Sequence, residues 1–351
     1  MITITRKRAS VILLNFNGKE YLEKCFDSLK QQTYREMEVI LVDNASFDGS
    51  VKYVEENFPW VRIIKNRRNV GFAEGNNIGA NCAIGDYLVF LNCDTEVDPK
   101  WLEKLIEGAE SYPNVAICGS KILDIERKNV IQEVGGLCDM FGFSLSRGWG
   151  EEDQNQYAKT IETFYVSGAS LLIKKEVQNK IGLFDSKYFF NQEDVDICWR
   201  AQLAGYKVLV NPLSIVYHKG GGAASGAPGA NVDKGKGKYE TSIWRRYFAE
   251  RNILRTVLKN YSLSTVAKLL PPFFFIYLSE VFLYFMTRRS NVAMAYLNAL
   301  WWNMLNIKDT WCKHSEVQMM RKMCDREIRG KMIKGIGKLL RFREIGVPRF
   351  K

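Results

Sequence analysis

The stretch DYLVFLNCDTEVD, from Asp86 to Asp98, places polar and acidic residues directly after a run of strand-like apolar residues. Two interpretations of its end are open: a turn whose Asn and Asp side chains cap the backbone, or a site whose carboxylates hold a cation. Turn residues commonly follow strands, so this short motif does not decide between the two by itself. The surrounding sequence has to be read with it.

The segment around this stretch predicts an α/β fold. The runs SVILLNF, EVILVD, VRIIKN and DYLVFL are the clearest strands, and EYLEKCFDSLKQQ, with a helical pattern, separates the first two. From Ala9 to about Gly205, short β-branched runs alternate with helical patterns. This alternation predicts a mainly parallel sheet flanked by helices.

Polar side chains follow three of these predicted strands. They are Asn15 and Asn17, then Asp43 and Asn44, and then Asn92 and Asp94. In an open α/β sheet, ligands bind outside the carboxyl ends of the strands, so we expect these side chains to converge on one crevice. Their position favours the ligand-binding interpretation of the opening stretch.

A second acidic group, Glu193, Asp194 and Asp196, begins a predicted helix that ends at Gly205. The helix dipole favours acidic residues in a first turn, and this accounts for one or two of the three. Farther along, His218 precedes a segment rich in glycine and small residues. We predict that residues 219–238 form a flexible lid loop beside the crevice.

Charge and composition describe a globular chain of 351 residues with a basic end. Hydrophobic residues make up 46% and charged residues 25%, close to ordinary globular proportions. The formal charge is +11, and the segment from Lys313 to Lys351 has 12 Lys or Arg against 4 Asp or Glu. We therefore expect the basic charge to belong to a C-terminal appendage, with no nucleic-acid recognition module to use it.

Residues 241–351 are expected to form a helical, amphipathic and basic region. The apolar run within residues 269–305 opens with Pro271 and Pro272 and is interrupted by Glu280, so its unbroken length falls short of the ~20 residues that span a bilayer. We predict helices that lie at an anionic membrane surface. The alternative is a helical subdomain that packs on the rest of the protein.

The eight cysteines are scattered without a Cys-x-x-Cys pair, which predicts reduced thiols. The N-terminal segment MITITRKRAS is not followed by an apolar run of signal-peptide type. Both features predict a cytoplasmic protein, associated peripherally with the inner face of the cell membrane.

Six segments in order carry a resemblance to a known family: SVILLNFNG, ILVDNASFDGS, NVGFAEGNN, LVFLNCDTE, NQEDVDICWR and VYHKGGG. Together they resemble the family 2 glycosyltransferases of the GT-A fold, particularly the rhamnosyltransferase-like branch, over about residues 9–225. The resemblance implies a GT-A catalytic domain over residues 1–240 and inverting transfer of a hexosyl group from a nucleoside diphosphate sugar. It also implies a divalent metal, Mn²⁺ or Mg²⁺.

The resemblance also implies roles for single residues. Asp194 corresponds to the general base, and Glu193 is expected to orient the acceptor. Asp94 and His218 are the implied metal ligands, although Asn92 stands where the family motif often has a second Asp. Donor contacts are expected from Asn15, Asn17, Asp43, Asn44, Asn69, Gly71, Asn77, Asn92 and Asp94, and acceptor contacts from Trp199 and Arg200.

The expected reaction moves a sugar from dTDP-rhamnose or a UDP-sugar to a glycan or lipid-linked saccharide. Two other interpretations are a non-catalytic scaffold in a membrane glycan-assembly complex and a sugar nucleotidyltransferase. The presence of both Asp94 and Asp194 argues against the scaffold. A nucleotidyltransferase should carry Gly, Arg and Lys after the first strand, where this chain has NFNGKEYLEKC.

Overall fold

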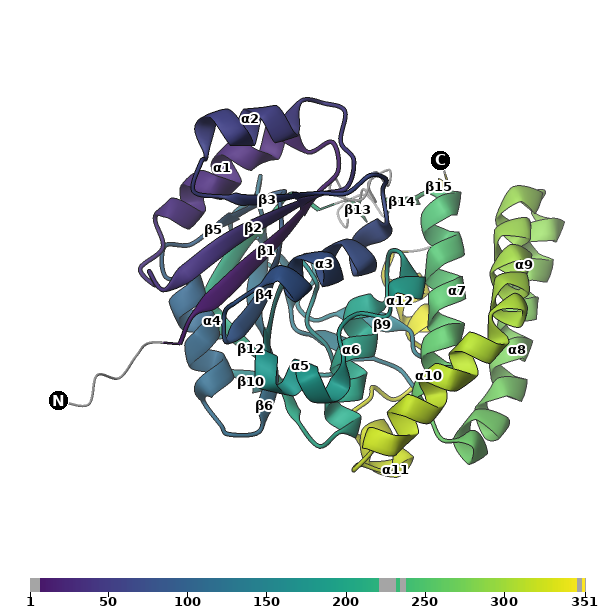
Figure 1. Ribbon diagram of the computed structural model, residues 1–351. Coiled ribbons are helices and arrows are strands. Elements are labelled where there is room, and N and C mark those ends of the chain that lie inside the picture. The colour runs from purple at the N-terminus through teal and green to yellow at the C-terminus, as the bar shows by residue number, and fades with distance from the viewer. Residues whose placement is uncertain (1–6, 221–231, 234–237, 346–348, 351) are drawn as a thin grey trace.

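A ten-stranded mixed sheet forms the centre of the structure, a computed structural model that describes residues 7–220, 232–233, 238–345 and 349–350 (Figure 1). The main strand order is β10-β12-β6-β11-β4-β1-β2-β3, with β5 beside β12 and β7 beside β6. Strands β3, β2, β1 and β4 are parallel, and β11 runs antiparallel between β4 and β6. The predicted mainly parallel sheet is confirmed.

The strands of this sheet are β1 (Ala9–Asn15), β2 (Met37–Asp43), β3 (Arg62–Lys65), β4 (Tyr87–Asn92), β5 (Thr95–Val97), β6 (Val115–Asp124), β7 (Ile131–Val134), β10 (Ile161–Glu162), β11 (Ser170–Lys174) and β12 (Lys207–His218). The first four match the four strands expected from the sequence. Smaller sheets contain β8 (Gly136–Cys138) with β9 (Ser144–Ser146), and β13 (Val232–Asp233) with β14 (Lys238–Thr241) and β15 (Arg349–Phe350).

Helices cover both faces of the sheet. One apolar core joins it to α1 (Lys19–Lys30), α2 (Ser50–Asn57) and α4 (Trp101–Glu110). The other core joins it to α3 (Gly71–Cys82), α5 (Lys175–Ile181), α6 (Glu193–Leu203) and most of the C-terminal helices. Those are α7 (Ile243–Asn260), α8 (Leu263–Met286), α9 (Ser290–Leu305), α10 (Ile307–Met320) and α11 (Asp325–Gly330). The 3₁₀ turn η1 (Ser186–Tyr188) precedes α6, and α12 (Gly337–Ile345) follows α11.

Alternation along β1 explains the two cores. Val11 and Leu13 face the core that contains α1, whereas Ile12 and Leu14 face the core that contains α3. Helix α3 approaches β1 so closely that a Cβ at Gly75 would lie 2.4 Å from Leu14 Cδ1. The glycine therefore serves helix–sheet packing, and this packing places the first turn of α3 at the carboxyl edge of the sheet.

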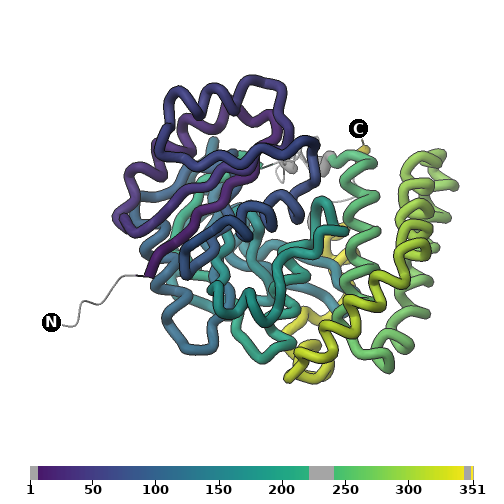
Figure 2. Tube along the Cα trace, viewed as in Figure 1, coloured from purple at the N-terminus to yellow at the C-terminus, as the bar shows by residue number. Residues whose placement is uncertain are grey.

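Helix α7 lies between the sheet-bearing half and the outer helices α8 and α9 (Figures 1 and 2). The sequence predicts an apolar face with the Arg and Lys residues on the opposite, outward face. This expectation is wrong for three cations, Arg251, Arg255 and Lys259, which are buried. The core-packed alternative therefore describes α7.

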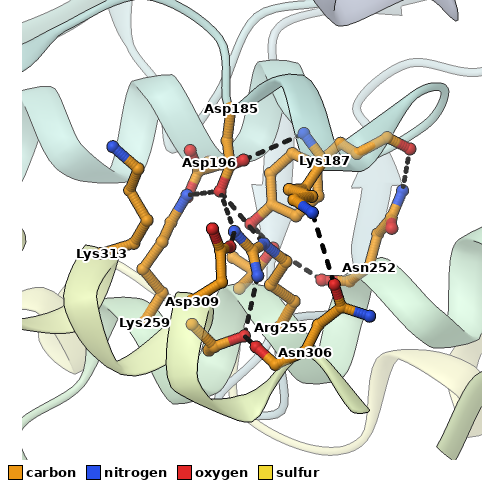
Figure 3. Close-up of polar contacts among 12 residues, drawn as sticks. Asp185, Lys187, Asp196, Asn252, Arg255, Lys259, Asn306, Asp309 and Lys313 are labelled. Carbon is orange, nitrogen blue, oxygen red and sulfur yellow. Dashed lines mark hydrogen bonds and ion pairs between the residues drawn. The ribbon is translucent and has the colours of Figure 1, made fainter. Parts of the chain in front are cut away.

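Two of these buried cations, Arg255 and Lys259, pair with carboxylates of α6 and of the segment that leads into it (Figure 3). Lys259 Nζ lies 3.0 Å from Asp185 and 2.8 Å from Asp196, and Arg255 lies 2.9 Å from Asp185. Asp196 also pairs with Arg200 at 2.9 Å. Asp196 is thus an ion-pair residue inside the protein, and the helix dipole does not account for its position.

The basic C-terminal segment packs against the rest of the chain. Lys331 pairs with Glu162 at 2.7 Å, and Lys338 pairs with Glu250 and Glu280 at 2.8 and 2.7 Å. Strand β15 pairs with β14. Two of the twelve cations that the sequence assigns to an appendage thus pair with acids elsewhere in the fold, and contacts cross the predicted domain boundary at residue 240.

Helix α8 is longer and more continuous than the sequence pattern suggests. It contains Pro271 and Pro272 within its 24 residues, and by length and composition alone it is long and apolar enough to cross a membrane. One face packs on the protein through Phe273, Tyr277 and Val281. The opposite face exposes Phe275, Leu278, Phe282 and Phe285.

Replacing Lys259 with Met is expected to lower the free energy of unfolding by about 3–5 kcal/mol, because it leaves two buried carboxylates without their shared cation. Burial alone would raise the pKa of Asp185, but Lys259 and Arg255 hold it below its ordinary value. The loss should therefore shrink as the pH falls and these acids protonate.

The measurement is urea unfolding of the two chains at pH 7 and at lower pH. A matched control is Lys313→Met, since Lys313 pairs with Glu316 on the surface, and its effect should stay within about 0.5 kcal/mol. Equal stability losses in the two variants would contradict the role given to Lys259.

Candidate active site

The end of β1 is joined to the end of β2 by a buried polar network. Asn15 Nδ2 donates to Asp43 at 2.9 Å and to the hydroxyls of Ser46 and Ser50 at 3.0 and 2.8 Å. Asp43 also accepts from the Ser46 amide at 2.9 Å. Asp43 therefore caps the turn after β2, and the same contacts hold its carboxylate at the strand edge.

Asn44 connects this network to the first turn of α3. Its Nδ2 donates to Asn69 and to the Gly71 carbonyl, both at 3.2 Å. Asn69 in turn accepts from the Gly71 amide at 2.9 Å. Gly71 has φ +86°, and a Cβ there would lie 2.5 Å from the Phe189 carbonyl oxygen. This position excludes any larger residue, and it joins the Asn69–Gly71 turn to the chain before α6.

Two other predicted donor contacts have different surroundings. Asn17 has φ 55° and joins the turn after β1 to the turn after β2. Its backbone amide donates to the Ser46 hydroxyl, and its Oδ1 accepts from the Phe47 amide. Asn77 exchanges two hydrogen bonds with the backbone of Phe184, at 2.8 and 3.1 Å. Asn77 thus joins α3 to the chain before η1, and its contact with the donor stays a prediction.

Asp94 is buried one turn beyond β4, and neither of its carboxylate oxygens has a hydrogen-bond partner among the described residues. His218 Nε2 lies 3.4 Å from Asp94 Oδ1. Asn92 Nδ2 lies 3.2 Å from the same His218 nitrogen. A buried carboxylate without a donor is costly, so this arrangement suits a cation.

Gln132 on β7 determines which nitrogen of His218 carries a proton. Its amide nitrogen donates to the His218 carbonyl at 2.8 Å, so its oxygen faces Nδ1 at 2.9 Å and accepts the Nδ1 proton. The lone pair of the ring is then on Nε2, which points toward Asp94. No local pattern around Gln132 in the sequence marks this role.

Asp194 lies at the start of α6 and is held by two amides. Its Oδ2 accepts from Gly168 at 3.1 Å and its Oδ1 from Val195 at 2.8 Å. Burial raises the pKa of Asp194 above its ordinary value, although these amide hydrogen bonds oppose the rise. A carboxyl with these surroundings can take up a proton more readily than an exposed aspartate.

Glu193 is also buried, and its Oε2 has no hydrogen-bond partner in the described part of the chain. Burial, with the neighbouring charge of Asp194, raises the pKa of Glu193 well above its ordinary value. Glu133 on β7 is a third acid close by, and like Glu193 it is buried. Burial raises its pKa to about 7, against hydrogen bonds from Ser146, Tyr165 and Ser167.

The sequence analysis did not identify Glu133, although the segment SGAS, from Ser167 to Ser170, offered a signal. Consecutive amides there bind two acids: Ser167 donates to Glu133 at 3.0 Å, and Gly168 donates to Asp194. Turns of Ser and Gly commonly expose backbone amides in this way. The pair of acids is therefore held by one turn between β10 and β11.

These groups lie along one edge of the sheet. Asn15 Oδ1 is 4.0 Å from Cys93 Sγ, which joins the Asp43 network to the residue before Asp94. The Asn92 amide donates to the Ala169 carbonyl, next to the Gly168 amide that holds Asp194. Asp43, Asp94, His218 and Asp194 are thus connected through short contacts at the carboxyl ends of β1, β2 and β4.

The two predicted acceptor contacts are wrong. Trp199 is fully buried and packs edge-to-face on Phe164 and Tyr261. Arg200 is buried, pairs with Asp196 and donates to backbone carbonyls of Ile181 and Leu183. Every residue of α6 except Asp194 is buried, so the parts of the helix that carry Trp199 and Arg200 lie in the core. The predicted lid, residues 219–238, falls largely outside the described residues.

The mixed, mostly parallel sheet with helices on both faces has the GT-A fold, which defines a class of sugar transferases. A model of the family described as Glycosyl transferase family 2 matches residues 10–182. The sheet-bearing part of the chain, residues 10–182, is therefore that of a family 2 glycosyltransferase, and the chain is similar to a rhamnosyltransferase.

Among curated proteins, the chain is 25% identical over 231 residues to N-acetylglucosaminyl-diphospho-decaprenol L-rhamnosyltransferase of Mycobacterium tuberculosis, covering 60% of this chain and 75% of the relative. It is 38% identical over 106 residues to an uncharacterized glycosyltransferase of Haemophilus influenzae, covering 30% of this chain and 36% of the relative.

A solved structure of GalNAc-T7 with UDP, GalNAc and Mn²⁺ resembles this fold. The TM-score is 0.57 at 19% identity, over 73% of this chain and 48% of that chain. The chain thus spans about half the length of that structure, and at this identity the likeness concerns the fold alone.

Proposed function

We propose that this chain is an inverting, metal-dependent glycosyltransferase that moves a hexosyl group from dTDP-rhamnose or a UDP-sugar to a glycan or lipid-linked saccharide. The reaction would take place at the cytoplasmic face of the cell membrane. The observation that carries the proposal is Asp94, a buried carboxylate without a hydrogen-bond partner in the described chain, beside His218. The family assignment sets aside the scaffold and nucleotidyltransferase alternatives.

The donor nucleotide is proposed to bind along the ends of β1 and β2. Asp43 and Asn15 are rigid there, and Asn44 holds the Gly71 turn at the same edge. The mycobacterial relative is named an L-rhamnosyltransferase, and the structural neighbour contains UDP and GalNAc. These names support either donor class, dTDP-rhamnose or a UDP-sugar.

A divalent metal, Mn²⁺ or Mg²⁺, is proposed to bind Asp94 and His218. No cluster of three or more metal-binding His, Cys, Asp or Glu side chains occurs among the described residues. The unpartnered Asp94 oxygens and the Nε2 lone pair nevertheless fit a cation that takes its other ligands from the donor and water. When bound, such a metal neutralises charge on a diphosphate leaving group as a Lewis acid.

Asp194 is proposed to accept the proton of the acceptor hydroxyl during its attack. The Gly168 and Val195 amides fix the direction of its carboxylate, and burial keeps its pKa raised. A raised pKa makes the ionised carboxylate a stronger base at neutral pH. Glu193 is proposed to help orient the acceptor from the same turn.

The exposed face of α8 is proposed to bind the membrane surface. Phe275, Leu278, Phe282 and Phe285 form one stripe on that face, and the opposite face packs on the protein. Glu280 is paired with Lys338, which favours a helix lying in the membrane plane over one that crosses it. A lipid-linked acceptor would then lie near the active site.

Asp194→Asn is expected to lower kcat by roughly 10²–10⁴-fold with UDP or dTDP affinity nearly unchanged, because only the proton acceptor is lost. The assay measures release of nucleoside diphosphate and transfer from UDP- and dTDP-sugars with Mn²⁺. The wild-type rate of sugar transfer should rise as the pH increases through the pKa of Asp194. This rise should be absent in the variant. Comparable turnover in wild type and variant would disprove the base assignment.

Gln132→Leu is expected to weaken Mn²⁺ binding by roughly 10- to 100-fold, because His218 then lacks the acceptor that keeps its lone pair on Nε2. Isothermal titration with Mn²⁺ in the presence of UDP measures the change. The control is Glu96→Gln, since Glu96 pairs with Lys24 and Lys128 at the surface. Unaltered Mn²⁺ affinity in Gln132→Leu would argue against the proposed ligands.

Phe282→Ser in the full chain is expected to lower binding to vesicles containing anionic lipid, because it removes an exposed ring from the centre of the α8 stripe. Vesicle flotation measures the bound fraction. Phe47→Ser is the control, since Phe47 is 85% exposed at the sheet end of the protein. A truncation before residue 241 is unsuitable because α7 belongs to the core. Identical flotation of both variants would refute docking through α8.

A further inference from the structure

Five aromatic rings gather where α7 begins beside the chain that leads into α6. The rings belong to Phe189, Phe190, Trp244, Tyr247 and Phe248. Trp244 lies 5.3 Å from Phe190 and 4.5 Å from Phe248, between ring centroids. Phe189 stacks on Phe248 at 5.4 Å. All of the rings except Phe248 are partly exposed, so the cluster presents an aromatic surface to solvent.

This cluster is built onto the segment that carries the proposed base. Phe189 accepts a hydrogen bond from the Phe72 amide in the first turn of α3, and Phe190 precedes Asp194 by four residues. Phe189, Asn191 and Gln192 all have positive φ, between 60° and 79°. Backbone of this kind is strained in residues other than glycine and persists only where its surroundings hold it.

Helix α7 supplies the groups that hold this strained segment. Asn252 Nδ2 lies 3.0, 2.9 and 2.6 Å from the carbonyls of Tyr188, Phe190 and Asn191. Arg251 donates to the Lys187 and Tyr188 carbonyls at 2.8 and 2.6 Å. The rings of Phe189 and Phe190 therefore have a defined position relative to Asp194, which is a requirement for a surface that orients a substrate.

An acceptor needs contacts near Asp194, and the two residues expected from the sequence cannot supply them, since Trp199 and Arg200 are buried. Phe189 and Phe190 are the partly exposed rings that precede the base in its own segment, and the Trp244 ring contacts both, at 6.2 and 5.3 Å between centroids. The Arg245 guanidinium also lies over the Phe190 ring, 5.1 Å from its centroid. Aromatic faces with an adjacent cation suit a ligand with an apolar C–H face and polar edges.

We propose that Trp244 and Phe190 form a stacking platform for the acceptor saccharide, with the C–H face of one pyranose ring lying on the indole. This inference rests on the proposed glycosyltransferase function and identifies where its acceptor binds. Stacking removes apolar ring surface from water, and the hydroxyl groups at the edge of the sugar stay free to face Asp194.

The test uses methyl β-glycosides of glucose, N-acetylglucosamine, galactose and mannose as probes, with binding to the full chain measured by saturation-transfer difference NMR. In wild type we expect saturation of the pyranose C–H protons of at least one glycoside. Trp244→Ala should raise the Kd for that glycoside roughly threefold to tenfold. Trp244→Phe should retain binding, because it keeps an aromatic face.

Trp311→Ala is the matched control. Trp311 is an exposed tryptophan that stacks on His314 at 4.9 Å, so its replacement also removes one aromatic contact. Thermal unfolding of each variant checks that the fold is retained. Wild-type chain that saturates none of the four glycosides would overturn the platform. So would a well-folded Trp244→Ala with wild-type glycoside affinity, or an equal loss in Trp311→Ala.

The glycoside experiment contains no donor, so it separates this inference from the proposed function. Nucleoside diphosphate binding and donor turnover are measured on wild-type chain in parallel. If glycosides bind through Trp244 but no donor is turned over, the proposed function is contradicted and the saccharide site is supported. If the donor is turned over and the KM for the acceptor is unchanged in Trp244→Ala, the stacking platform is contradicted and the proposed function stands.

Discussion

The active-site half depends on a set of buried ion pairs. Two cations of α7, Lys259 and Arg255, form them with the carboxylates of Asp185 and Asp196. Buried charges are tolerated only when each finds its partners, so the cations admit one placement of α7 against the segment before α6. Asp194 lies two residues from Asp196. The same placement therefore sets the position of the proposed base and of the rings before it.

The acids of this protein fall into two groups that differ in their partners. Asp185 and Asp196 are surrounded by cations, which hold the pKa of each below its ordinary value against the opposing effect of burial. Asp94 has no hydrogen-bond partner in the described chain, and Asp194 has only backbone amides and a raised pKa. The first group stabilises the fold, and the second is left available for a metal and a proton.

The C-terminal helices serve both groups. Helix α7 neutralises the structural acids with one end and presents Trp244 beside the strained Phe189–Gln192 segment with the other. Helix α8 packs on the protein through one face and leaves a stripe of apolar side chains uncovered. We thus propose that the C-terminal helices together support the sugar transfer, the contact with the acceptor and the contact with the membrane.

Much of the sheet could be predicted from the sequence because its signals are local. The apolar runs of β1, β2 and β4 end in polar residues such as Asn15, Asp43 and Asp94, and parallel strands bring these ends together whatever else packs on them. The family resemblance adds Asp194 and His218. Gln132 had no such signal, because its role depends on a contact with a residue 86 positions away.

The sequence by itself determined the order of the strands along the chain, the polar residues at their ends and the family. Only the tertiary structure decided that Asp196, Trp199 and Arg200 face the core while Asp194 stays at the edge, although all four share one helix. It also decided that the cations of α7 are buried. The physical reason is that burial and charge pairing come from segments about 60 to 75 residues apart, such as Lys259 with Asp185, and no local pattern encodes them.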